Sequence, residues 1–469
     1  MIQDIKILPE IQHTVSNDLA NQYRILPKSI LDNTLELYVD DSNNNNEDAK
    51  DELELFLGKN IVFHPINAAE IEKALSIYYR KERALTSNKS LNVDKGDFLE
   101  NLLTEAKSLK CSDIHFEVYE DSSRIRFRID GQLIERYKIE RDNYLELVNK
   151  VKIKAKLNIT EKRLPQDGRI TNESFDIRVS ILPTLFGEKI VMRLLGQDAS
   201  NIDLSTLGLQ KEELESYLEA VKKPNGIILI SGPTGSGKTT TLYATLRLLN
   251  DSRRNIVTVE DPIEYTLKGI NQVQLKEDIG LTFSSALKSF LRQDPDVIML
   301  GEIRDSETAL MAIRASLTGH LVLSTIHTNS AIGTISRLID MGVPSYLIAE
   351  TLNLSVAQRL VRKLCDNCKK ETPSNPKDFP LNFKFPYEIS SYYKPVGCNK
   401  CFHTGYKGRT AIYEILNIDN KIAEAIKNNT ITKLYGNDKN YKSLPEKAFE
   451  ILAIGETSLE EIYSILINI

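Results

Sequence analysis

The sequence predicts an α/β protein whose C-terminal part is built on a parallel sheet with helices on both faces. After residue 209, segments of helical character alternate with the short apolar runs GIILIS, NIVTVE, DVIML and HLVLSTI. Strands buried on both faces of a parallel sheet have this continuous apolar pattern. Further upstream, helical spacing in FLENLLTEAKSL is followed by the alternating stretches SRIRFRI and FDIRVSIL, which are typical of half-buried strands. We therefore expect an α+β domain to precede the α/β domain.

Two polar stretches of linker composition divide the chain. A chain of 469 residues is too long for one ordinary hydrophobic core. The stretches lie at 86–97 and 197–208. The predicted domains are a small N-terminal α/β domain at 1–85, an α+β domain at 98–196 and an α/β domain at 209–469 that ends in a helical part.

The composition is that of a globular protein without a general attraction to nucleic acid. Hydrophobic residues make up 41% of the chain and charged residues 27%, and the net charge is −5. An acidic balance gives no broad positive field for a phosphate backbone. The first residues lack the apolar core of a secretory signal, and no apolar run approaches the 18 or so residues that span a bilayer. We expect a cytoplasmic protein that reaches the membrane through partners.

The stretch SGPTGSGKTT predicts a nucleotide site, because it carries the pattern G-x4-G-K-T between an apolar strand and a helical segment. Glycines in such a loop let backbone N–H groups face phosphates, Lys238 is expected at the β and γ oxygens, and the Thr239 hydroxyl is expected on Mg²⁺. The absence of an Asn-Lys-x-Asp element favours ATP over GTP. The residues predicted to bind the nucleotide are Gly232, Pro233, Thr234, Gly235, Ser236, Gly237, Lys238, Thr239 and Thr240.

Acidic residues follow two of the predicted strands. In DPDVIMLGEIRD the usual position of the metal-side acid is Gly301, and the carboxylate comes one residue later as Glu302. Glu302 is a candidate for orienting the attacking water. In VTVEDPIE, the acids Glu260, Asp261 and Glu264 follow another strand, and parallel strands bring such ends to one edge of the sheet. A plain turn at Asp261-Pro262 is the alternative interpretation.

Two histidines, His320 and His327, bracket the predicted strand HLVLSTI. Seven positions apart on an extended strand, they point to opposite faces and do not form an obvious metal pair. Spacing alone gives neither of them a catalytic role, and an ordinary structural histidine is the alternative for each.

Four of the five cysteines form two C-x2-C pairs, which predicts a structural zinc site within an insertion at 363–411. Four thiolates are a common closed ligand set for Zn²⁺. Reduced free thiols are the alternative, since cytosolic disulfides are rare, and His403 is a conceivable substitute ligand. The predicted zinc ligands are Cys365, Cys368, Cys398 and Cys401.

Taken together, GPTGSGKTTTLYATL, VEDPIEY, LRQDPDVIMLGEIRDSETA, TGHLVLSTIHTN, AQRLVRKLCDNC and GYKGRTAIYEIL resemble the GspE/PilB family of ATPases from type II secretion and type IV pilus assembly. The resemblance runs from about residue 98 to the C-terminus and is weaker for the N-terminal docking domain. It implies a RecA-like P-loop ATPase domain that follows a PAS-like α+β domain and carries a tetracysteine zinc insertion.

The resemblance also assigns roles to single residues. It implies that a glycine normally precedes the catalytic glutamate, so that Gly301 and Glu302 fit the family. VEDPIE matches the family's Asp box, which implies that its acids position the metal or the water. TGHLVLSTIHTN matches the family's His box, which implies a function for His320 and His327. Arg178 and Arg193 match arginines that reach the phosphates, with exposed basic residues on a strand face as the alternative.

The implied function is a cytoplasmic, hexameric ATPase. It is expected to drive an inner-membrane platform protein that assembles a pseudopilus or pilus, and to be held at the membrane by a membrane-anchored docking protein. The tetracysteine insertion favours an assembly motor over a retraction motor of the same fold. An ATP-driven DNA translocase or helicase is the alternative from another class, which the acidic net charge disfavours.

Overall fold

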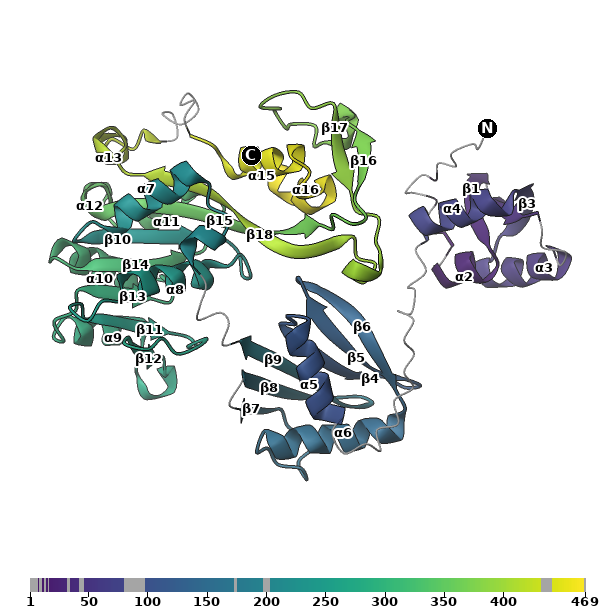
Figure 1. Ribbon diagram of the computed structural model, residues 1–469, viewed down its shortest axis with the longest axis horizontal. Coiled ribbons are helices and arrows are strands. Elements are labelled where there is room, and N and C mark those ends of the chain that lie inside the picture. The colour runs from purple at the N-terminus through teal and green to yellow at the C-terminus, as the bar shows by residue number, and fades with distance from the viewer. Residues whose placement is uncertain are drawn as a thin grey trace. The chain divides into compact units, whose positions relative to one another are not determined.

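The computed structural model of the chain falls into two compact units, which are described separately (Figure 1). The first contains Met1–Asn92 with Glu135–Lys138, and the second contains Val93–Ile134 with Ile139–Ile469. The predicted linker at 86–97 and residues 197–202 of the second linker lie outside the described part of the chain. The residues that the structure describes are 7, 11, 14–15, 17–31, 34–41, 46–79, 98–172, 175–196, 203–431 and 441–467.

The N-terminal unit contains a three-stranded sheet and helices. Strand β1 pairs antiparallel with β2. Strand β2 pairs parallel with β3, and helix α3 lies between β2 and β3 in the sequence. The alternating strand β2 buries Leu35, Leu37 and Val39, which join Ile71 and Leu75 of helix α4 in one core. The elements are α2 (Asn17–Gln22), β1 (Ile25–Leu31), β2 (Thr34–Asp40), α3 (Asn46–Leu57), β3 (Asn60–Ile66) and α4 (Ala68–Tyr78).

Within the second unit, residues 98–196 form a six-stranded sheet with two helices. The strand order is β6-β5-β4-β9-β8-β7. Along β5 the apolar residues are buried and the arginines half-buried, which confirms the predicted alternation in SRIRFRI. The elements are α5 (Phe98–Ser108), β4 (Asp113–Val118), β5 (Ser123–Ile129), β6 (Gln132–Ile139), α6 (Arg141–Lys154), β7 (Gln166–Asn172), β8 (Phe175–Thr184) and β9 (Gly187–Gly196).

The C-terminal sheet has seven strands in the order β12-β11-β13-β14-β10-β15-β18. The pairings from β12 to β15 are parallel, as predicted, but β18 is antiparallel to β15. The four apolar runs that predicted a parallel sheet do pair in parallel, and the antiparallel edge lies outside them, where β15 and β18 are joined through the cysteine-containing insertion rather than by a crossover helix. The strands are β10 (Gly226–Ser231), β11 (Ile256–Glu260), β12 (Asn271–Gln274), β13 (Val297–Leu300), β14 (Leu321–Ile326), β15 (Leu352–Leu364) and β18 (Tyr406–Asn417).

Helices cover both faces of this sheet, as its doubly buried strands require. Successive residues of β10 enter different cores: Ile227 joins the cluster of α9, α10 and α11, and Ile228 joins the cluster of α7 and α8. The helices are α7 (Lys211–Val221), α8 (Lys238–Leu249), α9 (Phe283–Phe290), α10 (Ser306–Leu317), α11 (Ala331–Asp340), α12 (Ser345–Thr351), α13 (Asn420–Lys427), α15 (Leu444–Ala453) and α16 (Leu459–Ile467).

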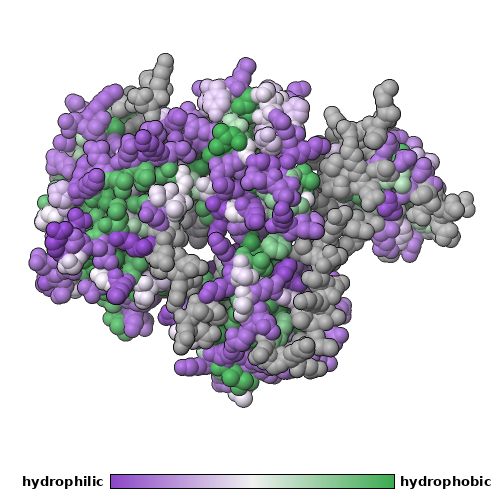
Figure 2. All heavy atoms as spheres, viewed as in Figure 1, coloured by the Kyte–Doolittle hydropathy of each residue, from purple (hydrophilic) through white to green (hydrophobic). Residues whose placement is uncertain are grey.

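The surface seen in Figure 2 is mostly hydrophilic, with hydrophobic residues in several smaller groups. Between β15 and β18, a small lobe contains the two-stranded sheet of β16 (Lys370–Pro373) and β17 (Ser391–Lys394). In the described part of the chain, no helix has the length and apolar character needed to cross a membrane.

Candidate nucleotide site and cysteine cluster

The nucleotide loop connects β10 to α8 at the carboxyl edge of the parallel strands. Gly232, Gly235 and Gly237 have φ values of 145°, 82° and 88°. These are left-handed conformations that side chains with a Cβ rarely adopt. Lys238 and Thr239 begin α8, so the amino end of that helix lies directly after the loop. The loop therefore has the geometry that aims backbone N–H groups at an anion.

Lys238 is a buried cation with no carboxylate within ion-pair distance among the described residues. Its ammonium group donates to the carbonyl oxygens of Gly232 and Pro233, at 2.7 and 3.1 Å. Burial lowers the pKa of Lys238, while the charge of Glu302 partly opposes this change. Nearby, the buried Ser236 hydroxyl has no hydrogen-bond partner in the described structure. A buried cation and an unpartnered hydroxyl in a glycine-rich loop fit the phosphates of ATP.

Glu302 follows β13 on the same edge of the sheet. Its side chain is 14% exposed, forms an ion pair with Arg304, and accepts a hydrogen bond from Nε2 of His327 at 3.2 Å. The preceding glycine has a steric reason: a Cβ on Gly301 would lie 3.3 Å from the carbonyl oxygen of Val259 on the neighbouring strand β11. The close approach of β11 and β13 thus favours glycine where a metal-side acid is usual, and the carboxylate is displaced by one residue.

Glu260 ends β11 beside β13 but has a closed environment. Its side chain accepts hydrogen bonds from the hydroxyls of Tyr243 and Thr258 and from the Gln272 amide, the last two at 2.6 and 3.1 Å. Glu260 is 3% exposed. Tyr243 lies on α8, the helix that follows the nucleotide loop, so this network ties α8 to β11.

The other acids of VEDPIE lie in the loop after β11. Asp261 is exposed, and Glu264 is half-buried. The Arg178 guanidinium on β8 contacts Glu264 at 3.3 Å and also donates to the Ile263 carbonyl. Arg178 is thereby at the Asp-box loop, whereas Arg193 on β9 pairs with the buried Asp113 of its own sheet at 2.9 Å.

The two histidines lie at opposite ends of β14. His327 follows the strand and contacts Glu302, so it is at the carboxyl edge with the nucleotide loop. His320 precedes the strand, and its Nδ1 lies 2.8 Å from the Ala315 carbonyl oxygen at the end of α10. The fold therefore gathers His327 with the predicted site and leaves His320 at the other edge, where its catalytic role stays a prediction.

Several residues at the site were not predicted from the sequence. Arg304, two positions after Glu302, could have been suggested by its place in GEIRD. Tyr243 and Gln272 come from elements far from Glu260 in the sequence, and Gln358 on β15 donates to the Ser236 carbonyl oxygen of the loop. Only the pairing of the strands brings these residues together.

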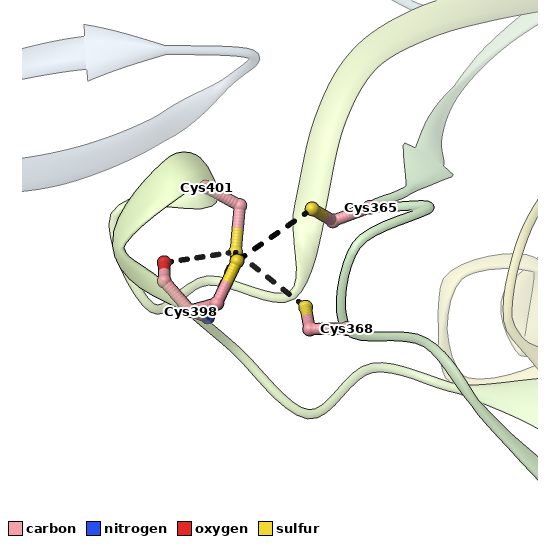
Figure 3. A group of neighbouring side chains, drawn as sticks. All are labelled: Cys365, Cys368, Cys398 and Cys401. Carbon is pink, nitrogen blue, oxygen red and sulfur yellow. Dashed lines mark hydrogen bonds between the residues drawn. The ribbon is translucent and has the colours of Figure 1, made fainter.

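The four predicted zinc ligands form one compact group, with their sulfur atoms all within 4.8 Å of one another. Figure 3 shows two of them converging from each C-x2-C turn. The Sγ–Sγ distances are 3.9 Å for Cys365 and Cys398, and 3.8 Å for Cys368 and Cys401. A tetrahedral Zn²⁺ with Zn–S bonds of about 2.3 Å needs sulfur atoms about 3.8 Å apart. The cluster could thus bind zinc, and His403 is not part of the group.

The chain matches known families and proteins over most of its length. Residues 93–464 match the family described as type II/IV secretion system protein, and residues 2–85 match the MshEN domain. Type II secretion system protein E of Klebsiella pneumoniae is 46% identical over 370 residues, which is 77% of this chain and 73% of that protein. The type IV pilus assembly ATPase PilB of Myxococcus xanthus is 38% identical over 496 residues, covering 98% and 87% of the two chains.

Solved structures agree on the fold. The pilus retraction motor PilT with bound ADP is similar at a TM-score of 0.55 and 25% identity, over 78% of this chain and 95% of PilT. The ATPase DotB of Legionella pneumophila is similar in fold at a TM-score of 0.58 and 23% identity, over 79% and 95% of the two chains. The chain therefore belongs to the type II/IV secretion family as a GspE/PilB-type ATPase, and it powers secretion or pilus assembly.

Proposed function

We propose that this ATPase works as a homohexamer of RecA-like domains, in which ATP hydrolysis drives an inner-membrane platform protein during pseudopilus or pilus assembly. The observation that carries the proposal is the meeting of the nucleotide loop with Glu302 and His327 at one edge of the sheet. The names of the relatives, a secretion protein E and a pilus assembly ATPase, support the same machine.

At this site the residues of the loop would hold the phosphates, and the Thr239 hydroxyl with Asp261 would hold Mg²⁺. Magnesium supplies charge neutralisation on the phosphate oxygens. Glu302 would orient the attacking water and accept its proton, with His327 fixing the direction of the carboxylate. Glu260 would act from its buried position by holding the Asp-box loop against α8.

Arg178 and Arg193 would act on the phosphates from the α+β domain, which we propose to be PAS-like. Arg178 lies against Glu264, so it would have to exchange that carboxylate for a phosphate. Arg193 would first have to leave Asp113. Exchange of one anionic partner for another keeps the guanidinium paired in both states.

The chain would reach the inner face of the cytoplasmic membrane through a membrane-anchored docking protein and the platform protein, without direct contact with nucleic acid. The N-terminal domain at 1–85 and the zinc-bound insertion at 363–411 favour assembly over retraction. ATPase stimulation by DNA would instead support the translocase alternative.

The test is replacement of the chromosomal gene by a Glu302→Gln version, with surface pili, exoprotein secretion and transformation scored together. We expect at least one trait to fail at unchanged protein level, and the failing trait identifies the machine. Glu307→Gln is the matched control, because Glu307 is an exposed acid on the adjacent helix that pairs with Lys288. Survival of all three traits would contradict the proposed motor.

Zinc is tested separately by elemental analysis of the purified chain. We expect one zinc per chain, lost in a Cys398→Ser variant and retained in Cys111→Ser. Cys111 is the matched control, because it is a buried thiol that donates to the Asp113 carbonyl outside the cluster. A folded, zinc-free wild-type protein would rule out the zinc site.

A further inference from the structure

Strand β15 lies next to β10 and passes the nucleotide loop at Gln358. The parallel pairing of the two strands ends with Ser231 opposite Ala357. The next residues along each strand are Gly232 and Gln358, so Gln358 is level with the start of the loop. Gln358 is only 2% exposed. A buried amide requires hydrogen-bond partners, and these partners show what the residue holds.

Both ends of the Gln358 amide are bonded to the nucleotide loop or its helix. Nε2 donates to the Ser236 carbonyl oxygen at 2.9 Å, and Oε1 accepts from the Thr241 hydroxyl at 2.9 Å. The contacts are close: a Cβ on Gly237 would lie 2.8 Å from Nε2, and a Cβ on Gly232 would lie 2.4 Å from the Gln358 carbonyl oxygen. Gln358 thus contacts the loop near both of its ends.

The bond to Ser236 decides which way one peptide group of the loop faces. The carbonyl of Ser236 and the N–H of Gly237 belong to the same planar, trans peptide, so they point in opposite directions. Because Gln358 holds the carbonyl on the β15 side, the Gly237 N–H is turned away from β15. In the described part of the chain, no backbone hydrogen bond uses this N–H. It is left available for an anion, while the repulsive carbonyl oxygen is kept away.

We propose that Gln358 is a positioning residue for ATP binding, which sets the phosphate-accepting conformation of the loop before the nucleotide arrives. The inference rests on the proposed role of the loop in holding the phosphates. A loop that is already ordered loses less conformational freedom on binding, so the effect is on nucleotide affinity. Gln358 itself does not touch the phosphates and acts only through Ser236, Gly237 and Thr241.

The same strand provides a matched control at the other end of β10. Asn353 is also a buried amide, at 9% exposure, and its Nδ2 donates to the Asn225 carbonyl oxygen at 2.8 Å. Asn225 directly precedes β10, on the edge away from the nucleotide loop. Loss of either amide removes a buried hydrogen bond between β15 and the chain around β10, but only Gln358 bears on the loop.

The experiment compares the full-length Gln358→Met and Asn353→Leu variants, which keep the approximate length of each side chain and remove the amide. The Kd of a non-hydrolysable ATP analogue, the KM and kcat for ATP, and the Tm are measured for each. We expect Gln358→Met to raise Kd and KM about tenfold with kcat changed less than threefold. Asn353→Leu is expected to lower the Tm about as much as Gln358→Met does, but to leave Kd unchanged.

A second variant keeps the test decisive if Gln358→Met does not fold. Thr241→Val removes the hydroxyl that donates to Gln358 Oε1 at 2.9 Å and has a longer contact of 3.4 Å with the Gly237 carbonyl oxygen, and we expect a rise in Kd of about threefold. An unchanged Kd in the Gln358 or Thr241 variant, or an equal rise in Asn353→Leu, would overturn the positioning role. If the wild-type chain binds the analogue no better than Lys238→Ala, the proposed nucleotide site itself fails, and the inference fails with it.

Discussion

Glu302 and Glu260 end neighbouring strands of one sheet, yet their surroundings differ. The Glu302 carboxylate lies at the open edge with two basic neighbours, Arg304 and His327. The Glu260 carboxylate is enclosed by the neutral donors Tyr243, Thr258 and Gln272. Basic neighbours at an exposed edge can be exchanged for water or phosphate, whereas enclosed neutral donors cannot be lost without leaving buried groups unpaired.

The comparison shows that position at a strand end does not by itself give an acid its role. Both residues follow apolar strands, and the sequence offers the same argument for each. The difference comes from the neighbours: α8 places the neutral Tyr243 hydroxyl on Glu260, whereas the partners of Glu302 are the basic side chains of Arg304 and His327. We therefore expect substitution of Glu302 to lower the rate of ATP hydrolysis, and substitution of Glu260 to lower the stability of the fold.

The largest effect is expected for Glu302→Gln. Loss of the group that orients water and accepts its proton should lower kcat by about 10² to 10⁴. Affinity for a non-hydrolysable ATP analogue and the Tm should stay near the wild-type values. Steady-state ATPase assays on the purified chain, with circular dichroism as a check of folding, measure this. A kcat within threefold of wild type would remove Glu302 from the chemistry.

Glu260→Ala should act mainly on stability. It leaves the Tyr243 hydroxyl, the Thr258 hydroxyl and the Gln272 amide without their buried acceptor, at a cost of about 1–3 kcal/mol in the free energy of unfolding. Urea denaturation measures the loss. Glu264→Ala, which removes a half-buried acid of the same loop, should cost less. The two glutamates would not differ in role if Glu260→Ala kept its unfolding free energy and lowered kcat as much as Glu302→Gln.

His327→Ala should lower kcat about tenfold, because a hydrogen bond to a charged group is worth about 1.5 kcal/mol or more. The Glu302 carboxylate would remain but lose one of the groups that direct it. His327→Gln retains an N–H donor on a side chain of similar reach, so we expect it to restore part of the rate. Equal rates in the two variants would show that the contact with Glu302 does not matter.

Tyr243→Phe should have the smallest effect. It removes one of three donors to Glu260 and leaves the ring packed against Tyr265, at a centroid distance of 4.5 Å. The expected loss is about 1 kcal/mol in unfolding free energy, with kcat and KM within twofold of wild type. A large loss of rate would mean that the Glu260 network takes part in the chemistry.

Local patterns predicted much of this fold, including the glycine-rich turn between β10 and α8. The loop from Gly232 to Thr239 could be predicted because strand, glycines and helix are contiguous in the chain. The side of β5 that carries arginines followed from period-two alternation. In both cases the residues that predict the structure lie within or next to the element that they form.

Long-range pairing explains what could not be predicted. Ser458 and Glu461 have the spacing of a capping box, and the Ser458 hydroxyl does accept from the Glu461 N–H. The Glu461 carboxylate, however, pairs with Arg362 on β15 instead of completing the box. Likewise, the burial of Glu260 depends on Tyr243 and Gln272, which only the folded sheet brings together.

The length of β15 has a mechanical consequence for the motor. The strand runs for 13 residues, roughly 40 Å, past the nucleotide loop at Gln358 and directly into Cys365 of the cysteine cluster. From Leu354 to Leu364 it is paired with β18, which returns from the same cluster, and the register shifts between Arg362 and Leu364. Two hydrogen-bonded strands therefore connect the lobe to the nucleotide loop. We expect the amide hydrogens of 358–364 to exchange with solvent as slowly as those of the central sheet, so that a displacement of the lobe would act on the nucleotide loop.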